Sequence, residues 1–278
     1  MHLLNRICLP LLLALALCAP ALANGIMLDP LRIVVPDGQR YAALTILNQS
    51  SAEPIIYNIS TVPLRMQEDG SLYEPTTLTK REALTRSMLR FSPRTARLQP
   101  GGKQAVRIAV RKPPNLPEGE YMSYISVSPL DTPESVAPKL DHAASLAPKG
   151  SSMVVDVKVG MRIPVIIYQG SPSVQTAVSA VRAVRRKDGK AYLDLRLNRT
   201  GNRSSFVETS VFRVANGRKE LIAHKDRTVT YFPLAARTLT LPISDPEFRG
   251  GRILVELRNY KDATQTVIDS KEFSVQLP

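Results

Sequence analysis

The chain is a succession of short stretches rich in β-branched and aromatic residues, and no other feature of the sequence constrains the fold as strongly. The stretches recur about every ten residues between turn signals, the pattern of an all-β sandwich. The dipeptides Asp69-Gly70, Asp188-Gly189 and Asn216-Gly217 are typical of hairpin turns. The expected strands are Leu31–Val35, Tyr41–Asn48, Ile55–Val62, Ala105–Val110, Tyr121–Ser128, Met153–Tyr168, Ser179–Val184, Ala191–Leu197, Ser210–Val214, Arg237–Pro242 and Arg252–Asn259.

The length of 278 residues suggests two domains, each large enough to bury a core of its own. A small-residue link that carries a proline, Gln169-Gly170-Ser171-Pro172-Ser173, separates two strand-rich halves. We therefore expect one β-sandwich over residues 24–169 and a second over residues 170–278. A single short helix is predicted, at Lys80–Leu89.

Residues 1–23 have the features of a cleavable signal peptide. Arg6 supplies the positive charge, Leu9–Leu17 form a short apolar core, and Ala21-Leu22-Ala23 is an A-x-A cleavage site. Cleavage removes both cysteines, Cys8 and Cys18, so the mature chain is expected to have no disulfide, no thiol nucleophile and no cysteine-ligated metal.

The net charge of +13 is compatible with nucleic acid, a membrane surface or an acidic partner. Cleavage would remove one of the 37 basic residues and no acidic one, which leaves +12 on the mature chain. An exported protein has little access to genomic DNA, so the charge does not indicate nucleic-acid binding.

The predicted strand Met153–Tyr168 alternates strictly from Val155 to Ile163, and it follows a proline-bearing loop over residues 129–152. One face carries Val155, Val157, Val159, Met161 and Ile163, and the other carries Val154, Asp156, Lys158, Gly160 and Arg162. In one interpretation the apolar face covers the core of its own domain. In the other, this is an edge strand that lends its apolar side chains to a partner.

Enzyme signatures are mostly absent from the sequence. There is no G-x-S-x-G nucleophile elbow and no glycine-rich phosphate loop. His142 and His224 do not lie in any cluster with the spacing of metal ligands. We therefore expect neither catalysis nor a bound metal or cofactor.

The chain has Pro93, Leu98, Pro100-Gly101 and Val106-Arg107-Ile108 in the spacing P-x-x-x-x-L-x-P-G-x-x-x-x-V-R-I, followed by Leu116-Pro117 with Glu118 and Glu120. These motifs resemble the pattern P-x-x-x-x-L-x-P-G-x-x-x-x-V-R-[IL] and the "LP…E" after it in the periplasmic chaperones of chaperone–usher pilus assembly. The matching segments elsewhere are Leu28–Val34 at the start, and Asp188-Gly189-Lys190, Asn198 with Gly201, and Arg237–Leu241 in the second half.

This resemblance implies two immunoglobulin-like β-sandwich domains in a boomerang arrangement with a cleft between them. It implies a non-enzymatic periplasmic chaperone that acts in fimbrium biogenesis and cell wall organization. Such a chaperone inserts its G1 strand into pilus subunits that lack a strand, and delivers them to an outer-membrane usher. The sequence leaves open whether the free protein self-associates and so covers its edge strands.

The resemblance further implies roles for particular residues. In the family, an arginine on the first strand and a lysine on G1 hold the C-terminal carboxylate of the subunit. The arginine corresponds to Arg32. Pro164 stands where the family has its lysine, so Arg162 is the expected substitute, and Lys158 lies on the same face but further away. The donor residues would be Val155, Val157, Val159, Met161 and Ile163. The cysteine pair that flanks this strand in the best-known long-loop members is missing here.

Two other classes of protein remain as alternatives. An exported adhesin or carbohydrate-binding sandwich would need an aromatic platform, but the chain has no Trp and only 5% aromatic residues. A secreted hydrolase would need a catalytic constellation that the sequence does not show.

Overall fold

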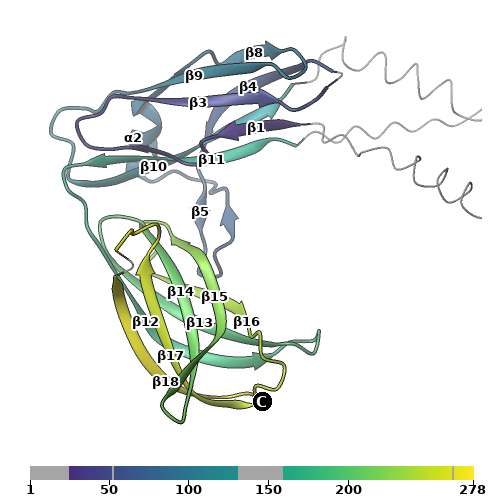
Figure 1. The fold of residues 1–278 in the computed structure, drawn as a ribbon. Coiled ribbons are helices and arrows are strands. Elements are labelled where there is room, and N and C mark those ends of the chain that lie inside the picture. The colour runs from purple at the N-terminus through teal and green to yellow at the C-terminus, as the bar shows by residue number, and fades with distance from the viewer. Residues whose placement is uncertain (1–24, 52, 131–158, 265) are drawn as a thin grey trace, which may run out of the picture.

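The computed structural model describes residues 25–51, 53–130, 159–264 and 266–278. Strands make up most of these residues, which confirms the all-β prediction. They form two sandwiches that lie at an angle to each other (Figure 1). Each sandwich has its own hydrophobic core, one between Ile26 and Ile167 and the other between Val178 and Val275.

Two sheets face each other in the first sandwich. One has the strand order β1-β3-β9-β7 and the other β2-β11-β10-β4-β8. The strands are β1 (Ile26–Asp29), β2 (Ile33–Val35), β3 (Tyr41–Asn48), β4 (Ile55–Val62), β7 (Leu89–Ser92), β8 (Thr95–Leu98), β9 (Lys103–Val110), β10 (Gly119–Pro129) and β11 (Met161–Gln169). Residues 153–158 of the long strand predicted from the sequence lie outside the described residues.

The beginning of the chain passes from one sheet of the first sandwich to the other. β1 pairs antiparallel with β3, from Ile26 opposite Asn48 to Asp29 opposite Thr45. The chain then crosses, and β2 pairs parallel with β11. Residues 30–32, which include Arg32, make this crossing.

The predicted helix is present as α2 (Lys80–Met88). Thr79 and Glu82 form a reciprocal capping box at its start, with the Thr79 side chain accepting from the Glu82 N–H and the Glu82 carboxylate accepting from the Thr79 N–H. Before α2, the short strands β5 (Arg65–Met66) and β6 (Leu72–Tyr73) form a hairpin that extends toward the second sandwich (Figure 1).

The second sandwich packs the sheet β12-β13-β16 against the sheet β15-β14-β17-β18. Its strands are β12 (Val174–Arg185), β13 (Ala191–Gly201), β14 (Ser205–Ala215), β15 (Arg218–Thr230), β16 (Ala236–Pro242), β17 (Gly250–Asn259) and β18 (Val267–Gln276).

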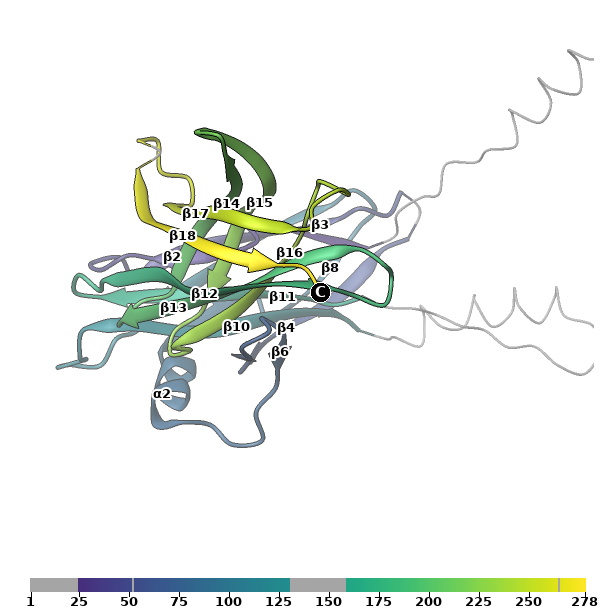
Figure 2. The ribbon, with the colours of Figure 1, turned by 90° about the horizontal axis from the view of Figure 1, so that it is seen from below.

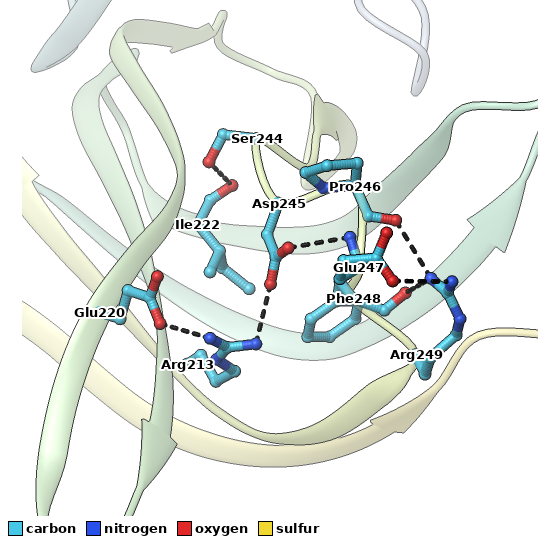
Figure 3. Close-up of polar contacts among 9 residues, drawn as sticks. All are labelled: Arg213, Glu220, Ile222, Ser244, Asp245, Pro246, Glu247, Phe248 and Arg249. Atoms are coloured by element: carbon cyan, nitrogen blue, oxygen red, sulfur yellow. Dashed lines mark hydrogen bonds and ion pairs between the residues drawn. The ribbon is translucent and has the colours of Figure 1, made fainter.

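Polar contacts hold the link between β16 and β17 in place (Figure 3). The Asp245 carboxylate accepts from the Arg213 guanidinium at 2.8 Å and from the Glu247 N–H at 2.9 Å. Phe248, which is 1% exposed, is thereby held in the core of this domain.

Candidate functional site at an open sheet edge and the domain interface

One edge of the first sandwich is only partly covered. β2 pairs with β11 over Val165, Ile166 and Ile167, and β1 belongs to the other sheet. Within the described residues, the segment Met161–Pro164 has β10 on one side and no strand on the other. Its outer backbone groups are therefore available to pair with an additional strand.

Exposed apolar side chains lie on the edge strands β1 and β2, in the crossing between them and just before β11. Met27 on β1, Leu31 in the crossing, Val34 on β2 and Val159 just before β11 are 42%, 60%, 37% and 67% exposed. Isolated surface hydrophobics are common, but a group of them along an unpaired edge is typical of an interaction surface.

The two faces of β11 have different surroundings. Ile163, Val165 and Ile167 belong to the core of the first sandwich. Ile166 is also fully buried, yet it lies on the opposite face and does not belong to that core. On the same face of the neighbouring strand β10, Tyr124 makes an edge-on contact with Tyr231 of the second domain. This second face is therefore directed at the domain interface.

The predicted donor residues have different surroundings in the structure. Val155 and Val157 lie outside the described residues, and Val159 is exposed. Met161 packs against the core of its own domain, and Ile163 is 2% exposed within that core. Ile163 is thus a core residue in this structure, where the opposing sheet covers β11, and its donor role stays a prediction.

Arg32 lies at the domain interface. Its guanidinium carbon is 4.2 Å from the ring centroid of Phe206 in the second domain, a cation–π contact. Burial raises the pKa of Tyr231, and the positive charge of Arg32 is one of the influences that oppose this rise. Among the described residues, no carboxylate lies within ion-pair distance of Arg32, so the cation remains available to an anionic group.

The second predicted cation, Arg162, is less well placed than Arg32 to bind a carboxylate. Pro164 pairs with Tyr124 of β10 and brings no charge to its position. Arg162 pairs with Ser126. It lies two residues before Pro164, which is roughly 6.6 Å along β11. Its guanidinium is 3.8 Å from the carboxylate of Glu74, with both side chains about half exposed, so this ion pair is weak. Lys158 lies outside the described residues.

A buried carboxylate joins the two domains close to this site. Glu120 on β10 is 1% exposed and accepts from the Ser204 N–H at 2.8 Å and from the Ser204 hydroxyl. Burial raises the pKa of Glu120, and the two hydrogen bonds from Ser204 oppose that rise. The Ser204 hydroxyl also accepts from the Phe232 N–H at 2.9 Å.

The β5–β6 hairpin makes a second connection between the domains. The Glu68 carboxylate accepts from both terminal nitrogens of Arg196 on β13, at 2.9 and 3.1 Å. The Glu68 carbonyl accepts from the Thr238 N–H on β16 at 2.7 Å. Arg196 lowers the pKa of Glu68.

Neither connection was predicted from the sequence. Glu120 stands in a motif that the sequence analysis singled out, but its partner Ser204 is 84 residues away. The available signal was a single carboxylate in a strand with no other charged residue, because such a group is buried only when it has hydrogen-bond partners.

Within the described residues, no group of three His, Cys, Asp or Glu side chains is placed to hold a metal ion. In the same part of the chain, no helix is both long and apolar enough to cross a membrane.

Comparisons with known proteins find similarity only at the level of structure. No family model and no curated protein sequence matches the chain. Among solved structures, the E. coli chaperone DraB is 15% identical with a TM-score of 0.44, over 92% of this chain and 97% of that chain. The Pseudomonas aeruginosa CupB2 chaperone is 13% identical with a TM-score of 0.44, over 91% of this chain and 100% of that chain. A chain of the CsuC–CsuE complex of chaperone and pilus-tip subunit from Acinetobacter baumannii is 13% identical with a TM-score of 0.42, over 91% of this chain and 99% of that chain.

Proposed function

We propose that this protein is a periplasmic chaperone that captures pilus subunits by donor-strand complementation and delivers them to an outer-membrane usher. The observation that carries this proposal is the unpaired edge of β11 at Met161–Pro164, with Arg32 in the chain crossing beside it. A subunit strand that pairs with this edge would run past a cation that has no carboxylate partner among the described residues.

The proposed interaction has two parts with different physical roles. The open edge supplies backbone hydrogen bonds, and the exposed apolar side chains, such as Val159, fill the groove of the incomplete subunit. Arg32, with help from Arg162, holds the C-terminal carboxylate of the subunit and thereby fixes the register of pairing. Val155, Val157, Met161 and Ile163 are the other donor residues of this proposal, and Lys158 is a further cation for the carboxylate.

The test is co-expression in the periplasm with the subunits encoded by neighbouring genes. We expect the tagged wild-type protein to recover a soluble subunit in a complex of one to one, and the Val159→Asp variant to recover little or none. Val267→Asp is the matched control, because Val267 is also exposed but lies on β18 of the second domain. Equal recovery by wild type and Val159→Asp would contradict the proposed edge.

A further inference from the structure

A cavity of about 530 Å³ lies between the two domains, away from the open edge. Its walls come from α2 and β10 of the first domain, and from the segment between β15 and β16 of the second. In the sheet order β2-β11-β10-β4-β8, the open edge lies on the β11 side of β10. The cavity is lined by Pro63 and Leu64, which follow β4 on the other side of β10. Figure 2 shows α2 and the β6 end of the hairpin on one side of the molecule, near the label of β10.

The cavity is lined largely by apolar side chains. Met66 comes from the hairpin, Met122 from β10 and Leu234 from the second domain. Its volume falls within the range of roughly 300–1,000 Å³ that is typical of pockets for small organic ligands. Because both domains supply its walls, a bound molecule would contact both.

The cavity is lined by more cations than its carboxylates can pair with. Arg65 and Glu82 satisfy each other through two hydrogen bonds of 2.7 Å. The carboxylate of Glu120 is engaged by Ser204. Two further cations line the cavity, Arg81 and Arg86, and neither has a carboxylate within ion-pair distance among the described residues.

The two remaining cations have different surroundings. The Arg81 guanidinium is stacked between the rings of Tyr121 and Phe232, at 4.0 and 5.1 Å from their centroids. Arg86 is exposed, and its one hydrogen bond in the described structure is a 3.3 Å contact with the Thr61 hydroxyl. Arg86 is therefore the cation best able to meet a charged group at the rim.

Two described residues of the lining carry a buried polar atom without a hydrogen-bond partner, Nη2 of Arg81 and the hydroxyl of Ser123. Ser123 on β10 is 4% exposed, and its hydroxyl has no hydrogen-bond partner in the described structure. A buried hydroxyl without a partner costs free energy of folding, and a ligand with an acceptor atom would relieve that cost.

We propose that this cavity binds a small amphiphilic anion, such as a medium-chain carboxylate. Its apolar body lies against Met66, Met122 and Leu234, and its negatively charged head lies at the rim beside Arg86. This site is separate from the edge that we assign to pilus subunits, and it does not depend on that assignment.

The test is a fluorescence titration of the mature full-length protein with 1-anilinonaphthalene-8-sulfonate, an apolar anion. We expect saturable binding of about one equivalent, and displacement by decanoate. Decan-1-ol, which has the same chain without the charge, should displace the probe at least tenfold less effectively. Absence of saturable binding, or equal displacement by the alcohol and the carboxylate, would overturn the proposal.

Two variants locate the site. Ala235→Trp places a large side chain at an exposed position of the lining, where folding does not require a small residue, and should abolish binding. Arg86→Glu should weaken decanoate binding at least tenfold, whereas Arg252→Glu, the same change at an exposed position on β17, should leave it within twofold. Loss of probe binding in Val159→Asp with full binding in Ala235→Trp would place the probe at the open edge and refute the cavity site.

Discussion

The carboxylate of Glu120 in the first domain accepts hydrogen bonds from both the backbone N–H and the hydroxyl of Ser204 in the second. The same hydroxyl accepts from the Phe232 N–H, so a single serine satisfies a buried acid and a backbone donor at once. These two residues therefore help to fix how the domains are placed relative to each other.

Replacing Ser204 by alanine should destabilise the protein. The change removes one hydrogen bond to Glu120 and leaves the Phe232 N–H without its acceptor, which should lower the free energy of unfolding by about 1–3 kcal/mol. Urea denaturation measures this loss. Ser171→Ala, at an exposed position of the link between the domains, is the control and should change stability by less than about 0.5 kcal/mol.

The raised pKa of Glu120 predicts a particular pH dependence. Burial favours the protonated form in the folded state, so the contribution of this group to stability is fully present below the unfolded pKa near 4.5 and is lost as pH rises through the higher folded pKa. The wild-type protein should therefore lose stability relative to Glu120→Gln as the pH is raised above 4.5. A difference between the two that stays constant from pH 4 to pH 8 would contradict this prediction.

The contribution of Glu82 to stability should depend on pH in the opposite direction. Its bond with Arg65, together with the capping bonds to Thr79, lowers its pKa to about 2. The resulting stabilisation is present above the unfolded pKa of 4.5 and is lost as the pH falls toward 2.

A pair of variants separates the charge of Glu82 from its capping role. Glu82→Ala removes both and should cost about 1–2 kcal/mol at pH 7. Glu82→Gln can still cap the helix, so it should cost less. Urea unfolding at pH 7 and near pH 2 should show the gap between wild type and Glu82→Gln narrowing at low pH, and a gap that widens would refute the assignment.

The strands and the helix could be predicted because their signals are local. Alternation, turn dipeptides and the Thr79–Glu82 spacing are all contained in short segments. The connection between Glu120 and Ser204 joins segments that are far apart in the chain, so no local pattern contains it.

The predicted donor residues show a second limit of sequence patterns. Val159 and Ile163 have the same parity, so alternation assigns both to one face. The structure exposes the first and buries the second, because β11 is paired with β10 only from Met161 onward and Ile163 lies where the sandwich is closed. Alternation reveals which residues share a face but does not show where the covering sheet ends.

This difference between Val159 and Ile163 can be measured directly. Ile163→Ala should lower the free energy of unfolding by about 2–5 kcal/mol, because it leaves a cavity in the core of the first domain. Val159→Ala should change it by less than about 0.5 kcal/mol, because the side chain is 67% exposed. Similar losses in urea denaturation for the two variants would contradict the placement of β11.

The proposed role of Arg32 predicts a specific loss of subunit affinity. Charge-assisted hydrogen bonds to a carboxylate contribute about 1.5–3 kcal/mol, so Arg32→Ala should weaken binding of the subunit about 10- to 150-fold. The variant should still fold, since the lost stacking on Phe206 amounts to only about 0.5–1 kcal/mol. Arg252→Ala is the matched control for removing one exposed arginine and should bind as wild type does.

A modified subunit distinguishes an anchor for the carboxylate from a merely structural arginine. A subunit extended by several residues beyond its native C-terminus no longer presents its carboxylate at Arg32, so wild type should bind it about as weakly as Arg32→Ala binds the native subunit. Arg32→Ala should then cause no further loss with the extended subunit, because the interaction it removes is already absent. If Arg32→Ala weakens binding of both subunits by the same factor, Arg32 does not contact the carboxylate and acts through the domain interface instead.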